Sequence, residues 1–262
     1  MNPYEVYAIK YAHHARTASE NFIGGDPHDG PMPMDYFVWL VRDATSTFVV
    51  DTGFNAEAAR RRGRELLRCP SAALKRVGVD AATVRDVIVT HLHYDHIGNF
   101  DLFPAATFHL QDREMYFATG RHMADRAQSG AYDVEAVVGM VREVYKGRVR
   151  FHDGDAEIAP GLSVHHIGGH TLGLQAVRVR TQRGYVVLAS DASHYYANMF
   201  EKRPFPIVYD VAEMIAGWER CRALADSADH VIPGHDPEVL ARYPAAGADL
   251  GGIAVRLDVP PL

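Results

Sequence analysis

The chain has 262 residues, of which 47% are hydrophobic and 23% charged, a balance typical of a folded protein with a sizeable core. Its formal net charge of -6 argues against a nucleic-acid partner, because binding a polyanion needs a concentrated basic surface. The length suits one large α/β domain, so we predict a single domain over residues 1–262. The 2 cysteines cannot form a disulfide framework, and we see neither a signal peptide nor an apolar run of membrane length, so the cytoplasm is the expected location.

The predicted secondary structure alternates strands with short helices along the whole chain. Alternating or β-branched runs indicate strands, and longer amphipathic stretches behind capping residues indicate helices. In chain order we predict strands at 5–11, 36–41 and 47–50, a helix at 55–67, a helical turn near 80–83, strands at 86–89 and 107–110, helices at 112–118 and 133–145, strands at 149–151, 162–167, 174–180 and 185–189, and a helix at 211–225. The tail after His235 is rich in Gly and Pro, and we expect it to be loosely held.

Two further segments have more than one interpretation. Residues 22–34 form a predicted long loop whose apolar members are either a flap over a binding site or ordinary buried anchors. Arg60-Arg61-Arg62-Gly63-Arg64 is the only basic run in the chain. It falls on the predicted helix 55–67, and blocks this short are usually solvated, so we interpret it as an exposed helix face.

The densest concentration of chemistry is His91-Leu92-His93-Tyr94-Asp95-His96, directly after the predicted strand 86–89. Residues two apart in an extended backbone project to the same side, so His91 and His93 can bind one ion together. Asp95 and His96 then face a second position close by, which predicts a pair of metals. Chance clustering of surface histidines is the alternative, but such a group adds no packing and is costly to bury without a ligand.

Three later segments place one metal-capable side chain each where an apolar strand stops. His170 follows Gly168-Gly169 after the strand at 162–167, and Asp191 follows the strand at 185–189. His235 follows the short run Val231-Ile232-Pro233-Gly234. Rigid strand ends are common positions for metal sites, so these side chains complete the predicted ligand set.

In combination these motifs resemble the metallo-β-lactamase superfamily, whose pattern is His-x-His-x-Asp-His followed by a His, an Asp and a His. The resemblance covers nearly the whole chain and implies an α/β fold, the αββα sandwich of two mixed β-sheets flanked by helices. It also implies the ligand sets. One metal would be held by His91, His93 and His170, the other by Asp95, His96 and His235, and Asp191 would bridge the two.

The resemblance also gives a meaning to Asp51-Thr52-Gly53. Aspartic proteases use the same tripeptide, but they need two copies and this chain has one. In the superfamily this aspartate lies behind the metal loop and braces it, which is the role we predict for Asp51.

Within the superfamily the chain looks most like the N-acyl homoserine lactonases, which are quorum-quenching hydrolases. The similarity rests on Asp191-Ala192-Ser193 and on Gly234-His235-Asp236. Those lactonases often carry a tyrosine three residues past the bridging aspartate, where it helps to hold the substrate carbonyl. This chain has His194 there, followed by Tyr195 and Tyr196. We therefore predict that His194 or Tyr195 contacts the substrate oxygen.

The implied function is a metal-dependent hydrolase that opens a lactone ring by attack of a hydroxide bridging the two metals. Imidazoles and carboxylates without thiolate suit zinc best, with iron, manganese or cobalt as alternatives. Asp95 is the candidate to move a proton onto the leaving group. The expected partner is a small-molecule lactone or ester, with no nucleic acid and no membrane, and the expected state is a monomer or homodimer.

Other functions use similar sites. A thioesterase of the glyoxalase II kind, or another ester hydrolase of this fold, is the first alternative, although such thioesterases typically add a C-terminal helical domain and only 27 residues follow His235. A nuclease fits the charge poorly, and a β-lactamase would normally be exported. A non-enzymatic protein braced by metals is the other class, but such relatives usually lose ligands and all of the pattern's ligands are present here.

Overall fold

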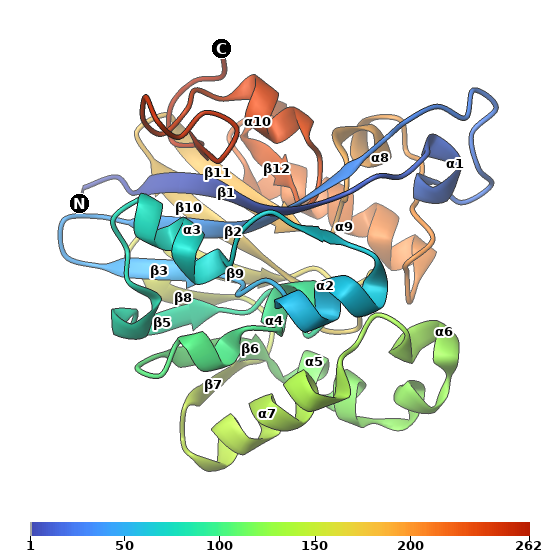
Figure 1. Cartoon of the computed structure of the whole chain (residues 1–262), viewed down its shortest axis with the longest axis horizontal. Helices are drawn as coiled ribbons and strands as arrows, with labels where there is room; N and C mark the ends of the chain where they lie inside the picture. Colours follow the sequence, from blue (N-terminus) through green and yellow to red (C-terminus); the bar gives the residue numbers. More distant parts are fainter. Residues whose placement is uncertain (1) are drawn as a thin grey trace.

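The computed structural model describes residues 2–262, and its centre is a pair of β-sheets packed face to face with helices on both outer sides (Figure 1). The first sheet has 8 strands, ordered β13-β1-β2-β3-β5-β6-β7 with β4 beside β1. These strands are β1 (Glu5–His14), β2 (Met34–Arg42), β3 (Thr47–Val50), β4 (Glu65–Leu66), β5 (Asp86–Ile88), β6 (Thr107–Gln111), β7 (Val149–His152) and β13 (Ala254–Arg256). The pairs from β3 to β7 are parallel and the others antiparallel, so the sheet is mixed.

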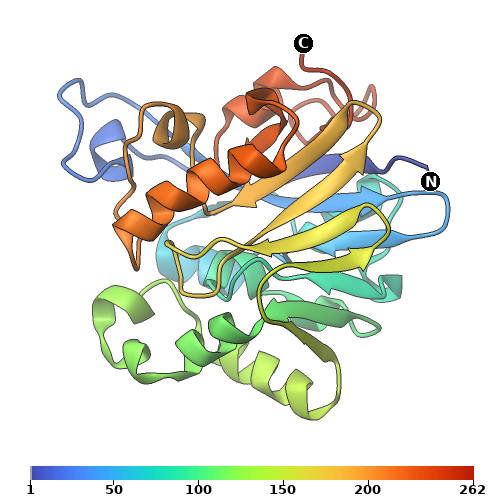
Figure 2. The ribbon, with the colours of Figure 1, turned by 180° about the vertical axis from the view of Figure 1, so that it is seen from behind.

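The second sheet has 5 strands in the order β12-β11-β10-β9-β8. They are β8 (Ala156–Ala159), β9 (Leu162–His166), β10 (Gln175–Thr181), β11 (Gly184–Ser190) and β12 (Val231–Pro233). Only the β11–β12 pair is parallel. Figure 2 shows this sheet from behind, with the long helix α9 lying across its outer face.

The helices cover the outer faces of the sheets or lie beyond the strand ends. They are α1 (Ala18–Asn21), α2 (Ala56–Arg62), α3 (Pro70–Arg76), α4 (Tyr94–Ile97), α5 (Asp112–Thr119), α6 (Arg126–Ser129), α7 (Val134–Tyr145), α8 (Tyr196–Phe200), α9 (Val211–Leu224) and α10 (Glu238–Arg242), with 3-10 turns at Ala81–Thr83, Phe100–Leu102, Arg121–Ala124 and Ala228–His230. In residues 2–262, no helix combines the length and the apolar character that a bilayer crossing requires.

Strand β2 explains why the core has two layers. Its alternate residues Phe37, Trp39 and Val41 belong to the apolar layer between the sheets, while Val38 and Leu40 pack into the layer under the helices. A strand that is buried on both faces has no need of polar alternation, which accounts for the continuous apolar run in the sequence. The predicted αββα sandwich is therefore confirmed.

The structure corrects two of the predicted elements. The helix expected over 55–67 ends at Arg62, because Gly63 adopts a left-handed conformation with φ 64° and turns the chain into β4. The tail after His235 is not loosely held, since β13 pairs with β1 and adds a strand to the edge of the first sheet. Local composition could not reveal this pairing, which joins residues nearly 250 positions apart.

Candidate metal centre

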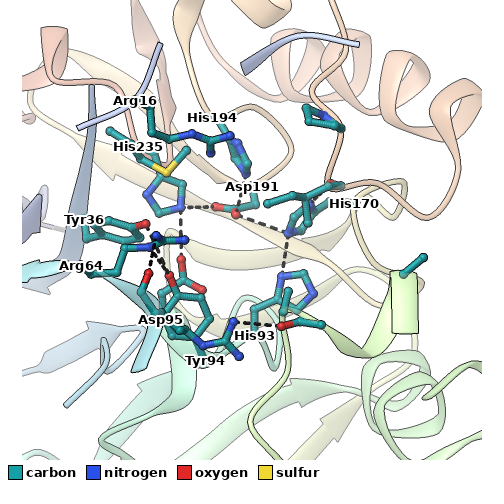
Figure 3. A pocket seen from close by; sticks show the side chains of 17 residues that line it. Arg16, Tyr36, Arg64, His93, Tyr94, Asp95, His170, Asp191, His194 and His235 are labelled. Atoms are coloured by element: carbon teal, nitrogen blue, oxygen red, sulfur yellow. Dashed lines mark hydrogen bonds and ion pairs between the residues drawn. The ribbon is translucent and has the colours of Figure 1, made fainter. Parts of the chain in front are cut away.

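Four chain segments converge at one end of the sandwich, at the ends of β5, β9, β11 and β12. The segment after β5 carries the histidine-rich loop and begins α4, as predicted for a strand-to-helix connection. The other three bring His170, Asp191 and His235. Figure 3 shows these side chains pointing toward a common space at the floor of a pocket.

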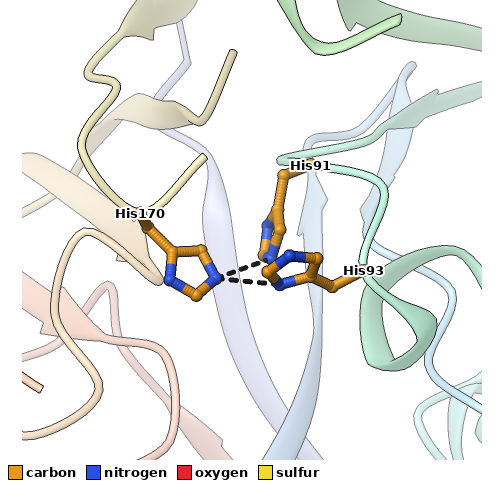
Figure 4. A group of neighbouring side chains, drawn as sticks. All are labelled: His91, His93 and His170. Carbon is orange, nitrogen blue, oxygen red and sulfur yellow. Dashed lines mark hydrogen bonds between the residues drawn. The ribbon is translucent and has the colours of Figure 1, made fainter. Parts of the chain in front are cut away.

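The first group consists of His91, His93 and His170, which lie around one point (Figure 4). Nε2 of His170 is 3.2 Å from Nε2 of His91 and 3.0 Å from Nδ1 of His93. All three rings are buried. Three ring nitrogens this close together are the arrangement expected of imidazoles that share one cation.

The second group consists of Asp95, His96 and His235, with Asp191 between it and the first. Oδ1 of Asp191 lies 3.5 Å from Nε2 of His96 and 3.1 Å from Nε2 of His235. Its other oxygen, Oδ2, lies 3.3 Å from Nε2 of His170. Both oxygens of Asp95 face this group, at 3.8 Å from Nε2 of His96 and of His235.

Two buried atoms of this cluster have no hydrogen-bond partner within residues 2–262. They are Nε2 of His96 and Oδ1 of Asp191. Leaving a buried polar atom unpaired costs about 1–3 kcal/mol. A cation placed among these atoms would satisfy both, so the residues fit a divalent metal, and the nitrogen and oxygen donors suit zinc or a similar ion.

The opposite nitrogens of the ligand-capable rings are held by the protein. Nδ1 of His170 donates to the carbonyl of Ile207 at 2.7 Å, and Nδ1 of His235 donates to the carbonyl of Asp35 at 2.9 Å. A backbone carbonyl can only accept, so each hydrogen bond leaves the Nε2 lone pair free to face the centre. Such outer hydrogen bonds orient metal-binding histidines and raise their basicity.

Asp51 lies behind the histidine loop and braces it, as predicted. Its Oδ2 accepts from Nδ1 of His96 at 2.8 Å, while Oδ1 accepts from the backbone N–H of Thr90 at 2.8 Å. The Thr90 hydroxyl also contacts Asp51 Oδ2 and the hydroxyl of Ser190. Asp51 and Ser190 have φ values of 61° and 47°, and such strain in residues other than glycine is concentrated at functional sites.

Electrostatics keep the first group of histidines neutral. Burial, together with the neighbouring imidazoles, holds the pKa of His91 and of His93 well below the usual value. Burial also acts to lower the pKa of His96, but the carboxylates of Asp191 and Asp51 outweigh it and raise that pKa well above normal. Neutral His91 and His93 beside the ionised carboxylate of Asp191 are in the protonation states that metal ligation needs, whereas His96 would release its extra proton when a metal binds.

Glycines precede two of the ligand-capable histidines, at positions where neighbouring atoms lie too close for any side chain. A Cβ on Gly169, whose φ is +78°, would lie 2.5 Å from the backbone nitrogen of Met214. A Cβ on Gly234 would lie 2.6 Å from Oδ1 of Asp191. Any side chain at either position would displace the backbone or the central carboxylate.

Of the two residues predicted to contact the substrate, only one lines the pocket. His194 lines the pocket, and its Nε2 lies 3.0 Å from Oδ2 of Asp191. Tyr195 is buried, but its hydroxyl points to the carbonyls of Met32 and Pro33 at 3.4 and 3.3 Å and does not line the pocket. The geometry therefore does not support a catalytic role for Tyr195.

Sequence reasoning missed Glu114, a fully buried carboxylate on α5. Its Oε1 accepts from the backbone N–H of Leu92 and from the Tyr132 hydroxyl, and its Oε2 accepts from the Thr171 hydroxyl and the Gly173 N–H. It thus ties together the loops that carry the first three histidines. A lone glutamate in a predicted helix carries no local signal of this role.

Sequence reasoning also misjudged the basic run. Arg62 and Arg64 line the pocket above the cluster, together with Arg16 from the segment after β1. The chain turn at Gly63 redirects Arg64 inward, so the interpretation of the whole run as a solvated face is wrong. Only Arg60 and Arg61 are exposed.

The sandwich fold, with a cluster of histidines and aspartates at its strand ends, is the architecture of a metal-dependent hydrolase. The family model described as "Metallo-beta-lactamase superfamily" matches residues 32–245, and the chain belongs to that superfamily.

Among proteins of similar sequence, an N-acyl homoserine lactonase of Bacillus sp. is 32% identical over 133 residues, covering 50% of this chain and 48% of the relative. The chain thus spans about half the length of that relative. The N-acyl homoserine lactonase AiiB of Agrobacterium fabrum is 27% identical over 226 residues, covering 78% of this chain and 80% of the relative.

Solved structures show the same fold. A quorum-quenching N-acyl homoserine lactone lactonase superposes with a TM-score of 0.75 at 23% identity, covering 91% of this chain and 94% of that one. An N-acyl homoserine lactone hydrolase with N-hexanoyl-L-homoserine bound at its catalytic metal centre also gives 0.75, at 22% identity and 91% and 96% coverage.

Proposed function

We propose that the chain binds two divalent metal ions, with zinc the first candidate. His91, His93 and His170 would hold one ion, Asp95, His96 and His235 the other, and Asp191 would bridge them. The proposal is supported by the unpartnered atoms of His96 and Asp191 and by the outer hydrogen bonds that direct the lone pairs inward. The absence of a cysteine from the cluster favours a hard or borderline ion.

We further propose that the protein is a lactonase, hydrolysing a cyclic ester of the N-acyl homoserine lactone kind. The observation that carries this is the Asp191 carboxylate lying between two ligand groups at the floor of an open pocket. The relatives named as N-acyl homoserine lactonases support the same substrate class. When bound, paired divalent ions would activate water and polarise an ester carbonyl.

Asp95 is the proposed proton carrier. It lines the pocket, and both of its oxygens face the second ligand group from 3.8 Å. A carboxylate at this position can accept a proton from the attacking water and return it to the alkoxide released when the ring opens.

The proposed role of His194 is to position Asp191. Burial lowers the pKa of His194 to about 4, although the Asp191 carboxylate acts in the opposite direction, so the ring is neutral at pH 7. Because a carboxylate only accepts, Nε2 of His194 carries the ring's single proton and donates it to Asp191 at 3.0 Å. In this arrangement its Nδ1 would be an acceptor, so we expect His194 to act through Asp191 and not as a hydrogen-bond donor to the substrate carbonyl.

The test combines metal analysis with a lactonase assay. Purified protein should contain about two equivalents of metal, a chelator should abolish hydrolysis of N-acyl homoserine lactones, and zinc should restore it. His170→Ala should lower kcat/KM by about 100-fold or more, since even loss of an outer-sphere partner reaches that scale. His28→Ala is the matched control, because His28 is exposed and does not line the pocket. Full activity in the metal-free protein would refute the proposal.

A further inference from the structure

The pocket above the candidate metal centre carries more positive charge than its acids balance. Arg16, Arg62 and Arg64 line it, and its only lining carboxylates are Asp95 and Asp191, which both belong to the cluster. Within residues 2–262, none of the three guanidiniums forms an ion pair with a carboxylate. Figure 3 shows Arg16 beside His194 and Arg64 beside Tyr36, both near His235.

Arg61, the neighbour of Arg62 on α2, behaves differently. Arg61 pairs with Asp133 and lies 3.9 Å from Glu57. The helix therefore has acidic partners within reach, but only on its solvent side. The charge of Arg62 and Arg64 is left uncompensated on the pocket side.

The guanidiniums on the α2 side are held in place before any ligand arrives. Arg62 stacks 3.9 Å above the ring of Tyr94 and donates to the carbonyls of Gly130 and Tyr132 at 2.9 and 3.0 Å. Arg64 donates from Nε to the Tyr94 hydroxyl at 3.2 Å and from Nη1 to the carbonyl of Arg62 at 2.7 Å. Nη2 of Arg64 has no acceptor in the part of the chain that is described. Preorganised donors lower the entropic cost of binding.

Beside His194, the guanidinium of Arg16 forms one hydrogen bond within residues 2–262. Its Nη2 donates to the carbonyl of Glu20 at 2.6 Å. Its Nε is buried and has no partner in residues 2–262, and the same is true of Nε of Arg62. Unsatisfied buried donors of a permanent cation are costly, and an acceptor entering the pocket would relieve that cost.

The cavity is also small. Its volume is about 240 Å³. Pockets for drug-sized ligands usually enclose about 300–1,000 Å³. A long neutral acyl tail would fill such a space without using the arginines and would bury their charge unpaired. The arginine fork matches the two oxygens of a carboxylate or the oxygens of a phosphate.

We propose, resting on the lactonase function proposed above, that the substrate is a compact lactone or ester carrying an oxyanion, a carboxylate in the first instance. Its ester group lies over the metal ligands. Its anionic end is bound by Arg64 and Arg16, while Arg62 shapes the wall and adds to the positive field.

The first experiment compares two lactones that differ only in charge. They are N-succinyl homoserine lactone and its terminal amide, N-succinamoyl homoserine lactone. The wild type should hydrolyse the anionic lactone with at least 10-fold higher kcat/KM, and this preference should shrink as salt rises. Arg64→Gln and Arg16→Gln should each cut the preference by about 10-fold or more, the scale of a charged hydrogen bond.

Arg60→Gln is the matched control, because Arg60 is an exposed arginine of α2, four residues before Arg64, and does not line the pocket. It should keep the full preference. Arg62 is left intact because its hydrogen bonds hold the backbone at 130–132. Thermal melts should verify that each variant is folded. Equal hydrolysis of the two lactones by the wild type, or an unchanged preference in both pocket variants, would overturn the inference.

A binding measurement separates this inference from the lactonase proposal. Isothermal titration calorimetry of the metal-loaded protein with succinate, and separately with inorganic phosphate, needs no turnover and distinguishes the two oxyanions. Weaker binding by at least 10-fold in Arg64→Gln and Arg16→Gln, but not in Arg60→Gln, supports the anion site even if neither lactone is hydrolysed. Identical binding by all four proteins would mean that metals alone hold the anion, and the inference would fail.

Discussion

Glu114 offers the sharpest test of how the candidate metal centre is held together. Its carboxylate accepts four hydrogen bonds of 2.6 to 3.2 Å from donors on three loops. A carboxylate can accept four and donates none, whereas the amide of Glu114→Gln has one accepting oxygen and one donating nitrogen. The hydroxyls of Tyr132 and Thr171 can rotate to accept from the new N–H₂ group. The backbone N–H of Leu92 or of Gly173 cannot.

The magnitude follows from that geometry. Either orientation of the new amide leaves one buried backbone N–H facing another donor, at a cost of about 1–3 kcal/mol of unfolding free energy. Leu92 lies between His91 and His93, and Thr171 follows His170. Their loops should therefore separate, and metal affinity should fall by about 10–100-fold, the range measured for outer-sphere changes at metal sites.

The assay needs a control that separates general stability from the site. Glu143 is also a buried glutamate, paired with Lys146 and Arg148, and it does not line the pocket. Glu143→Gln should lose stability in urea denaturation yet bind zinc as the wild type does, by competition with a chromophoric chelator. If Glu114→Gln keeps wild-type metal affinity, or loses no more affinity than Glu143→Gln, the hydrogen bonds of Glu114 do not order the histidines.

Three other outcomes follow from contacts in the structure. Gly234→Ala should push a Cβ to 2.6 Å from Oδ1 of Asp191 and lower zinc affinity by about 10-fold or more, and unchanged zinc binding would contradict this. Tyr195→Phe should leave kcat/KM for lactones within about 2-fold, because only a long contact to backbone carbonyls is lost; a large loss would show that the hydroxyl reaches the substrate. Glu5 has a lowered pKa because hydrogen bonds from Arg42 and Tyr7 outweigh the opposing effect of burial. Its stabilisation is present above the unfolded pKa of about 4.3 and is lost as pH falls, so the urea midpoints of wild type and Glu5→Gln should converge below about pH 4 and differ at pH 7.

The ligand-capable side chains could be predicted from sequence because their positions follow from local rules. His91 and His93 are two apart on an extended segment, and Asp191 lies directly beyond the end of β11, so each is placed by the strand that precedes it. The apolar runs likewise predicted most strands, and the resemblance to a superfamily supplied the order in which the segments meet.

What the tertiary structure decided is which face of each element meets the centre. Arg61 and Arg62 are neighbours on one helix, yet one pairs with a surface carboxylate and the other stacks on Tyr94 in the pocket. Glu114 is indistinguishable by local pattern from a solvated helical glutamate. The direction in which a helical side chain points is set by how the helix packs against the sheet, and that packing depends on contacts from distant parts of the chain. The sequence alone thus determined which residues could bind metal. The packing of α2 and of the segments that follow β1 and α2 determined the charge of the pocket, and the packing of α5 determined the rigidity of its floor.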